Sequence, residues 1–533
     1  MKKIIVSIIA FSLFSASCSD FIEKEQRGTQ TLENYFQTVQ ECENYANELT
    51  QRLLLAKEWW VLTAPRVTNE MATDDAWMGN TGQDNSAHRP ASQYIITPDN
   101  MGDMNSIYTA HFYTIQSANI GLERMALSPI TEAQKNQYMG ESLFVRAYCY
   151  YELVNLFGGV PVYTKSLGTG DLTLQRSSAA EVYAQIETDL KDAAAKLESA
   201  PVNKDGRINK WAAYALLARV SLFQEKWAEA KTYSNKVITE GPFALESDFL
   251  NIWNVNNHNG VESILEAQSS SVQNRDLGAA LPTLSGARGE DKKNFPSNDA
   301  ADVLDGWGWC MPTSDLENAY LSENDVIRRR STITKWGEAA YGDEVLNPTH
   351  KFSLNDNKSG RICRKYYIPI ATRRSLDKKD AHLPLNIPLI RLAEMYLTRA
   401  EANYHTNGDA LADINVIRAR VKLDPKTGIS GPTLLRQIYK ERRLELAFEG
   451  LRLFDIRREK DPTTGRPVIE SLMGPNGTFV QYNLNSTDPY ETTNLREPQD
   501  KGINFNPAKH LLWPIPQLDI DLSGGVIKQN PGY

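Results

Sequence analysis

The chain has 533 residues, of which 41% are hydrophobic and 23% are charged. This composition excludes a disordered protein and is typical of a globular one with a large core or two fused lobes. The formal net charge of -8 argues against binding nucleic acid or anionic lipid through a broad basic face, so uncharged ligands fit better.

A secretory signal is the first element of the chain. Lys2 and Lys3 give it a positive start, residues 4–14 are apolar but too few to span a bilayer, and small residues at 15–17 precede Cys18. This order predicts a signal peptide over residues 1–17. The cysteine that follows favours lipoprotein processing, in which Cys18 becomes the acylated first residue. Ser15 stands where such signals usually carry Leu, so plain secretion, with Cys18 an ordinary thiol, is the alternative.

Helical periodicity begins at about residue 31. Apolar residues recur there every three or four positions, at Phe36, Val39, Cys42, Ala46, Leu49 and Leu53. This spacing marks the buried face of a helix and predicts that Cys42 is a buried free thiol. The tryptophans at positions 59 and 60 end the stripe and are expected in the core. No two cysteines are close enough for a CxxC pair, and three disulfide pairings are open for Cys42, Cys149, Cys310 and Cys363.

The stretch MATDDAWMGNTGQDNSAHRP, residues 71–90, interrupts the helical pattern. It is too rich in Gly and polar residues to bury Trp77 in a helix face, so we expect a loop with a ligand-binding role. Its candidate ligand-binding residues are Asp75, Trp77, Asn80 and Arg89. An indole can stack on the apolar face of a sugar ring, while Asp, Asn and Arg side chains pair with its hydroxyls. The alternative for Trp77 is a core aromatic that pins the loop.

Further helices follow up to about residue 240. Ser178 and Glu181 have the spacing of a capping box, and an apolar face continues from there to Leu197. A small-residue pattern then occurs twice with the same intervals, at Ala218, Ala230 and Val237 and at Ala400, Ala412 and Ala419. Small residues at these offsets let antiparallel helices approach closely, as in tetratricopeptide (TPR) repeats. A chance match in a helix-rich sequence is the alternative.

Between about residues 261 and 386 the periodicity gives way to Gly, Asn, Ser and Pro with scattered aromatics. Short strands and long ordered loops are expected in such a stretch. In DVLDGWGWCMP, Trp307 and Trp309 flank Gly308, so in an extended segment both indoles would project to one side as a flat platform for a sugar ring. A buried loop anchor is the alternative for each of them.

The second helical region, about residues 388–460, contains the charge cluster IYKERRLELAFEGLRLFDIRRE. Guanidinium neighbours lower carboxylate pKa values, whereas the acid of a glycosidase needs a raised pKa. The cluster therefore favours a structural ion-pair network over a catalytic site. In this cluster Glu441, Glu445, Glu449 and Asp455 are interleaved with Arg442, Arg443, Arg452 and Arg457.

Familiar catalytic patterns are absent from the sequence. It has no phosphate-binding loop, no GxSxG and no HExxH, and its His residues are dispersed without ligand spacing. We therefore expect no catalytic residues, no metal and no other cofactor. Glycoside hydrolysis needs only two carboxylates, however, and spacing alone does not exclude it.

Four long motifs resemble the SusD/RagB family of Bacteroidetes outer-membrane lipoproteins. They are GESLFVRAYCYYELVNLFGGVPVYT, PLIRLAEMYLTRAEANYHTNGDALADINVIRARV, the charge cluster, and the terminal LLWPIPQLDIDLSGGVIKQNPGY. They occur in the family's order and span most of the chain, and CSDFIEKEQRGT resembles the family's mature start, which supports acylation of Cys18. The resemblance implies a mainly α fold of TPR-like helix pairs with long irregular loops and a few short strands. Over residues 18–533 the helical scaffold would occupy about 31–240 and 388–460, the loop-rich ligand side 261–386, and a loop-rich tail 461–533.

The same resemblance implies a surface-exposed outer-membrane lipoprotein that binds glycan without catalysis. It would hand the glycan to a SusC-like TonB-dependent transporter barrel, over which it acts as a lid. Ligand sites in the family differ between members, so the six candidate ligand-binding residues rest on residue chemistry and loop placement alone. The alternatives are an outer-surface glycoside hydrolase, a TPR-type protein-interaction scaffold and a peptide-binding lipoprotein.

Overall fold

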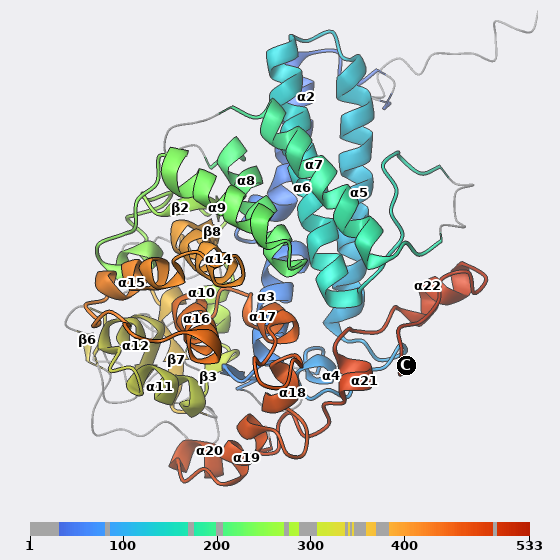
Figure 1. The fold of residues 1–533 in the computed structure, drawn as a ribbon. Helices are drawn as coiled ribbons and strands as arrows, with labels where there is room; N and C mark the ends of the chain where they lie inside the picture. Colours follow the sequence, from blue (N-terminus) through green and yellow to red (C-terminus); the bar gives the residue numbers. More distant parts are fainter. Residues whose placement is uncertain are drawn as a thin grey trace, which may run out of the picture.

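Helices make up most of the fold (Figure 1). The computed structural model describes residues 31–32, 34–79, 86–168, 175–198, 206–270, 277–286, 306–335, 339–341, 344–345, 359–368, 372, 383–493 and 498–533. The predicted signal peptide and Cys18 lie outside the described residues. The predicted mainly α fold with a few short strands is confirmed.

The long helices fall in two regions of the chain. The first contains α2 (Val39–Leu54), η1 (Trp59–Thr63, a π-helical turn), α3 (Ala64–Met71), α5 (Asp103–Leu127), α6 (Glu132–Phe157), α7 (Ala179–Lys196), α8 (Lys210–Phe223) and α9 (Trp227–Glu240). The second contains α14 (Leu392–His405), α15 (Ala410–Arg420), α16 (Gly431–Leu446) and α17 (Arg452–Arg458). In the part of the chain that the model describes, no helix combines the length and the apolar character that a bilayer crossing requires.

Capping boxes start three of the long helices, α2, α6 and α7. In the box of α7, which the sequence predicts, the Ser178 hydroxyl accepts a hydrogen bond from the backbone N–H of Glu181 at 3.2 Å. The Glu181 carboxylate in turn accepts from the backbone N–H of Ser178 at 2.7 Å. Two N–H groups that the helix leaves without internal partners are thereby satisfied, which fixes where α7 begins.

Neighbouring helices pack in pairs, and α5, α6 and α7 stand side by side as long upright helices in Figure 1. In the α8–α9 pair, the predicted small residues Ala218, Ala230 and Val237 are all fully buried. The α14–α15 pair differs, because the side chains of Ala412 and Ala419 are exposed. Ile414 and Ile417 lie in the contact instead. The repeated interval in this second pair is therefore a coincidence of sequence and does not mark a helix contact.

The strands are short and pair two by two, always antiparallel. The pairs are β1 (Ala76–Trp77) with β3 (Met311–Pro312), β2 (Ser263–Ala267) with β8 (Ile387–Arg391), β4 (Ile333–Lys335) with β7 (Arg361–Cys363), and β5 (Ala339–Tyr341) with β6 (Glu344–Val345). Short helical turns lie among them at α4 (Arg89–Ser92), η2 (Phe249–Trp253), α10 (Leu281–Leu284), α11 (Ser314–Leu321), α12 (Val326–Thr332) and η4 (Arg364–Tyr366). The β1–β3 pair joins two segments that are far apart in the sequence.

The C-terminal tail wraps along the lower edge of the molecule in Figure 1. It contains α18 (Ile469–Leu472), α19 (Thr478–Leu484), α20 (Pro489–Thr493), α21 (Pro507–His510) and α22 (Gln517–Leu522). The backbone N–H of Trp513 donates to the Leu156 carbonyl at 2.7 Å, and the side-chain amide of Asn530 donates to the Phe157 carbonyl at 2.9 Å. These bonds satisfy carbonyls at the C-terminal end of α6 and fasten the tail to it.

All four described cysteines are buried and unpaired: Cys42, Cys149, Cys310 and Cys363. The prediction of a buried free thiol at Cys42 is confirmed, and its Sγ lies 3.2 Å from the Ser128 hydroxyl. Burial raises the pKa of Cys363 to about 12. Thiols of this kind are inert and pack as small apolar groups.

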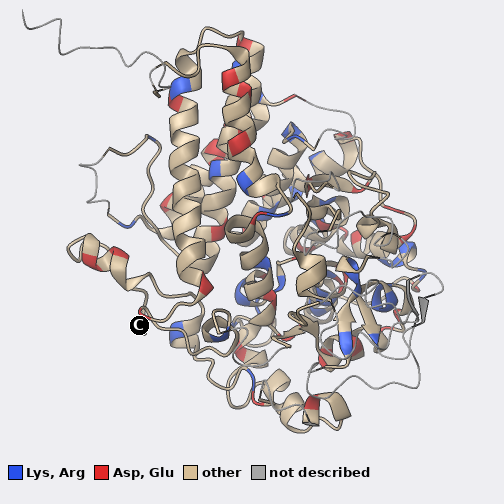
Figure 2. Cartoon of the chain, turned by 180° about the vertical axis from the view of Figure 1, so that it is seen from behind, with Lys and Arg blue, Asp and Glu red and all other residues tan. Residues whose placement is uncertain are grey.

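A network of buried arginine–carboxylate pairs holds the second helical region together. Arg391, at the end of β8, contacts Glu445 of α16 at 2.5 Å and Glu449 at 2.8 Å. Arg328 of α12 contacts Glu441 at 2.8 Å, and Arg420 of α15 also pairs with Glu445. The predicted structural network is thus present, but it lies in the interior. Figure 2, which views the molecule from behind, shows acidic and basic residues interspersed.

Arg457 departs from the predicted network. Its guanidinium lies 4.3 Å over the ring of Trp513 and donates to the His510 carbonyl at 3.0 Å, so it contacts the C-terminal tail and pairs with no carboxylate among the described residues. Burial lowers its pKa to about 10. A cation over an indole face gains electrostatic stabilisation without a counter-ion, which explains how an arginine can lie here.

Replacing Glu445 by Gln removes a charge that Arg391 and Arg420 share in a dry interior. Loss of one partner from a buried ion pair typically costs about 3–5 kcal/mol, so we expect the free energy of unfolding to fall by that order. The matched control is Glu132→Gln at the exposed start of α6, where the side chain is 82% exposed and a change below about 0.5 kcal/mol is expected. Urea unfolding followed by circular dichroism measures both, and equal midpoints for the two variants would contradict the role of the network.

Glu152 of α6 gives the stability a pH dependence. Burial raises the pKa of this carboxyl from 4.5 to about 7. The stability that the protonated carboxyl contributes to the folded state is therefore fully present below about pH 4.5 and is lost as the pH rises through about 7. Glu152→Gln removes this titration. We measure the free energy of unfolding by urea unfolding at about pH 5.5 and about pH 8.5. From the lower to the higher pH, we expect the value for the variant to rise by roughly 1–3 kcal/mol relative to that for the wild type. A difference between variant and wild type that does not change with pH would contradict this assignment.

Candidate functional site

The two loop segments that the sequence selects as ligand-binding lie side by side. The β1–β3 pair aligns Ala76 with Pro312 and Trp77 with Met311. Just beyond the pair, a Cβ on Gly79 would lie 2.1 Å from the Gly308 carbonyl oxygen. The two segments can therefore approach this closely only because Gly79 has no side chain. The structure thus brings segments 74–79 and 306–312 into one place.

Four tryptophans from two segments form what we call the indole cluster: Trp59, Trp60, Trp307 and Trp309. The ring centroids of Trp307 and Trp309 are 5.0 Å apart, those of Trp59 and Trp309 are 6.4 Å apart, and those of Trp59 and Trp60 are 6.2 Å apart. All three contacts are edge-to-face, the geometry that the ring quadrupole favours. Trp309 is 8% exposed, Trp59 and Trp60 are half-buried, and Trp307 is 43% exposed. One indole of the cluster therefore faces solvent with the others beneath it.

Backbone hydrogen bonds hold the Trp307–Trp309 segment in place. The N–H of Trp307 donates to the Thr283 carbonyl at 2.9 Å, and the N–H of Trp309 donates to the Leu284 carbonyl at 2.8 Å. Gly308 between them has φ +65°, a left-handed conformation that breaks the regular extended path. The predicted flat platform is therefore wrong, because the two indole planes meet at 66° and only Trp307 is exposed.

His88 supports the cluster from the side. Its ring lies 5.0 Å from that of Trp309, and its Nδ1 is 3.0 Å from an Asp103 carboxylate oxygen and 2.9 Å from the Thr68 hydroxyl. Burial lowers the pKa of His88 to about 4 and raises that of Asp103 to about 6. His88 is therefore neutral near pH 7, and its role here is to pack and to orient.

Asp75 and Trp77 are enclosed, which corrects the exposure that the sequence suggests. The Asp75 carboxylate is fully buried and accepts a hydrogen bond from Arg443 at 2.7 Å. Trp77 is also fully buried, and its indole N–H donates to Glu491 at 3.0 Å. Because these partners lie more than 360 residues away in the sequence, local composition gives no sign of them. Both residues anchor the segment to the scaffold, as the alternative reading of Trp77 proposes.

The remaining candidates are Asn80 and Arg89. Asn80 lies outside the described residues. Arg89 begins α4, directly after His88, and its half-buried side chain makes no hydrogen bond or ion pair to any residue in the described part of the chain. Its neighbour in the chain, His88, packs on Trp309. A guanidinium with unused donors is suited to bind hydroxyl or carbonyl oxygens of a ligand.

The charged residues around these segments are arranged for structure and not for acid–base chemistry. Asp74 is held by Arg452 at 2.8 Å and by Arg443 at 3.0 Å. Burial alone would raise the pKa of Asp74, but Arg443 and Arg452 hold it well below its ordinary value, whereas burial raises the pKa of the neighbouring Asp75. Both carboxylates are fully buried, so neither can act on a ligand as a general acid without first becoming exposed. The described residues contain no group of three metal-ligating side chains. What the site offers is an exposed indole with rigid support.

Two family models match the chain. Residues 262–533 match the model described as "SusD family", and residues 20–222 match the model described as "Starch-binding associating with outer membrane". The sequence is 25% identical to a SusD-like protein of Formosa agariphila over the full length of both chains. It is 26% identical to the starch-binding protein SusD of Bacteroides thetaiotaomicron, over 77% of this chain and 80% of that protein. A solved laminarin-binding SusD-like protein is similar in structure, with a TM-score of 0.73 at 25% identity over 93% of this chain and 99% of that chain.

Alanine substitutions distinguish the enclosed indole from the exposed one. Trp77→Ala removes a fully buried side chain and should lower the free energy of unfolding by about 3–5 kcal/mol. Trp307→Ala removes an exposed ring with one edge-to-face contact and should cost about 1 kcal/mol or less. Urea unfolding followed by far-UV circular dichroism measures both. A loss for Trp307→Ala as large as that for Trp77→Ala would mean that Trp307 is a structural residue.

Proposed function

Because the chain belongs to the SusD family, we propose that it is a non-catalytic glycan-binding lipoprotein of the outer cell surface. In this proposal an acyl group on Cys18 anchors it in the outer membrane, and it hands captured oligosaccharide to a SusC-like TonB-dependent transporter. Support for the membrane association comes from the description of the model that matches residues 20–222. Support for glycan as the ligand comes from the starch-binding and laminarin-binding relatives.

The main support for this binding site is that Trp307 is exposed while Trp309, the ring on which it packs, is buried. A sugar ring presents C–H groups on one face, and these gain dispersion and electrostatic contact on an indole. Because Trp307 packs on Trp309, Trp309 packs in turn on Trp59, and α10 holds the backbone of Trp307, little side-chain freedom is lost on binding. Arg89, and Asn80 beyond the described residues, are the proposed partners of the sugar hydroxyls.

Modest affinity is sufficient for this role. A protein that is anchored beside its transporter presents its cargo at a high effective concentration, so a weak site still delivers ligand. A very tight site would release its cargo slowly, since differences in affinity arise mostly from the dissociation rate. A single exposed indole with a few hydrogen bonds is consistent with such weak binding.

The glycoside hydrolase alternative finds little support in the geometry. A glycosidase needs two carboxylates that flank the sugar bond, one of them with a raised pKa. Burial raises the pKa of Asp75, next to Trp77, but Asp75 and Asp74 are both fully buried and bound to Arg443 and Arg452. These carboxylates cannot reach a sugar ring on Trp307 without the loss of their ion pairs.

Isothermal titration calorimetry with a panel of hexasaccharides tests the proposal. The panel contains laminarihexaose, maltohexaose and cellohexaose, because the relatives bind laminarin and starch. We expect at least one of them to bind the wild type and Trp307→Ala to weaken that binding at the same site at least tenfold, which corresponds to about 1.4 kcal/mol. The matched control is Tyr113→Ala, which removes a 67% exposed aromatic ring from α5 and should leave the affinity unchanged.

Chromatography of the incubated glycans completes this test. Recovery of intact hexasaccharide supports a binding protein, whereas released shorter sugars would show an enzyme. Binding that is equally strong in Trp307→Ala and the wild type would reject the indole cluster as the site.

A further inference from the structure

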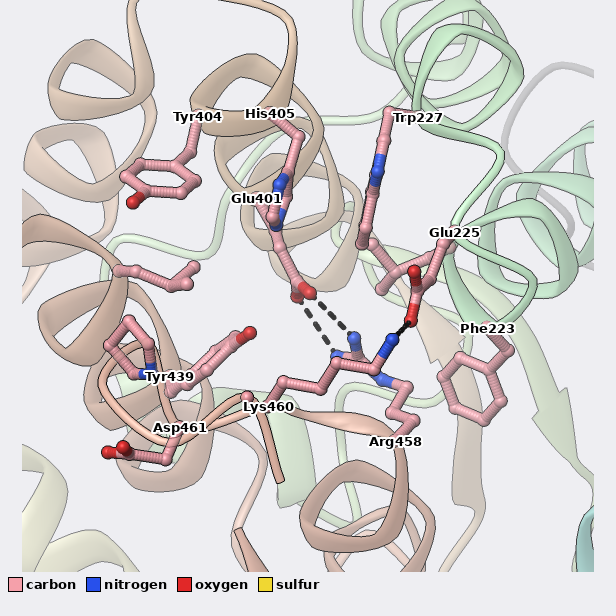
Figure 3. A pocket seen from close by; sticks show the side chains of 14 residues that line it. Phe223, Glu225, Trp227, Glu401, Tyr404, His405, Tyr439, Arg458, Lys460 and Asp461 are labelled. Atoms are coloured by element: carbon pink, nitrogen blue, oxygen red, sulfur yellow. Dashed lines mark hydrogen bonds and ion pairs between the residues drawn. The ribbon is translucent and has the colours of Figure 1, made fainter. Parts of the chain in front are cut away.

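A separate cavity of about 330 Å³ lies between α9, α14, α16 and the segment that follows α17 (Figure 3). None of the residues that line it belongs to the indole cluster. Its volume is at the lower end of the roughly 300–1,000 Å³ range of small-molecule sites. The cavity is thus large enough for a small ligand and independent of Trp307.

Aromatic rings form much of its wall. Trp227 and His405 stack with their ring centroids 3.9 Å apart and their planes at 11°, and Tyr404 meets His405 edge-on at 5.0 Å. Figure 3 shows Tyr404 and Tyr439 on one side of the space and Trp227 and Phe223 on the other. The rings come from four helices, α8, α9, α14 and α16, so the helical packing itself creates the aromatic lining.

Fixed charges lie among the aromatic rings. Glu401, which is 1% exposed, accepts two hydrogen bonds from the Arg458 guanidinium at 2.8 Å and 3.1 Å. Closer to solvent, Lys460 contacts Glu225 at 2.5 Å, and these side chains are 52% and 48% exposed. The first pair is held rigidly by its bidentate geometry, while the second is exposed to water and can exchange partners.

Unused hydrogen-bonding groups lie beside these charges. The hydroxyl of the half-buried Tyr404 and the ring nitrogens of the exposed His405 form no hydrogen bond within the described residues. A hydroxyl and a neutral imidazole each both donate and accept. Groups of this kind match the hydroxyls of a sugar, which also do both.

A tight hairpin, residues 460–467, forms one side of the cavity. The Asp461 carboxylate accepts hydrogen bonds from the backbone N–H groups of Thr463 and Thr464, both at 2.9 Å. The ends of the hairpin meet at a β-bridge between Lys460 and Pro467. The wall is therefore formed before any ligand arrives, which lowers the entropic cost of binding.

We propose that this cavity is a second carbohydrate-binding site, which takes the terminal one or two rings of an uncharged glycan. The inference rests on the proposed function, because it names a second site for the same class of ligand. Aromatic walls with a few fixed polar groups are the chemistry that holds sugar rings. Three acidic residues, Glu225, Glu401 and Asp461, face two basic ones, Arg458 and Lys460, so an anionic sugar is disfavoured.

The neighbouring cavity of about 290 Å³ is less suited to this role. It shares Tyr439, Asp461 and Pro462 with the first cavity, and four of its lining residues are basic. Those residues are already engaged: Arg436 with Asp461, Lys440 with Glu323, Arg443 with Asp75 and Arg452 with Asp74. A ligand there would have to displace existing ion pairs, so the proposal is confined to the larger cavity.

Counting bound ligands by native mass spectrometry and calorimetry tests the second site. With a hexasaccharide that binds the wild type, we expect two molecules per chain, one after Trp307→Ala, one after Tyr404→Ala and none in the double variant. The matched control is Tyr396→Ala on the same helix, which removes a half-buried tyrosine outside the cavity and should still bind two. In the Trp307→Ala background, Tyr404→Phe keeps the packing and removes only the hydroxyl, so it should weaken the remaining binding at least threefold.

The outcomes separate this inference from the proposed function. One molecule per chain in the wild type and none after Trp307→Ala would overturn the second site and leave the glycan-binding function intact. No binding of any panel member would overturn both. Binding to Trp307→Ala that neither Tyr404 variant weakens would place the remaining site elsewhere and overturn this assignment. Stronger binding of an acidic hexauronate than of a neutral hexasaccharide in Trp307→Ala would overturn the preference for uncharged ligands.

Discussion

The proposed glycan site depends on buried contacts between arginines and carboxylates. Arg443 of α16 and Arg452 of α17 hold Asp74 and Asp75, which directly precede β1. Because β1 pairs with β3, the same ion pairs also fix the segment that leads into β3. That segment contains Trp307. The helical scaffold thus determines the position of an exposed indole through two short strands and one ion-pair cluster.

An ion pair also fixes part of the wall of the second cavity. Arg458 is the last residue of α17, the helix that also carries Arg452, and it binds Glu401 at the wall of the cavity. A buried ion pair contributes little net stability compared with apolar packing, but it requires one geometry. Both proposed sites therefore consist of aromatic rings held by partners that cannot easily rearrange. This arrangement fits a protein that receives a ligand without reshaping itself.

The sequence predicts the scaffold well and the site only in part. Local periodicity and capping contain the information for the helices, so the stripe through Cys42 and the box at Ser178 are found where expected. The environment of Trp77 depends on Glu491, to which no local pattern points. The tilt between Trp307 and Trp309 depends on the backbone conformation of Gly308, which spacing does not reveal. Sequence spacing does not reveal the second cavity, because its rings come from four helices that only the tertiary packing brings together.

A crystal structure of the protein with a bound hexasaccharide tests the central claim most directly. We expect a sugar ring stacked on Trp307 at about 4 Å between carbon atoms, while the ion pairs of Asp75 and Asp74 stay intact. The contrary result is a sugar that contacts Trp77 or Asp75 after the Arg443 pair has opened, or one bound where neither Trp307 nor Tyr404 touches it.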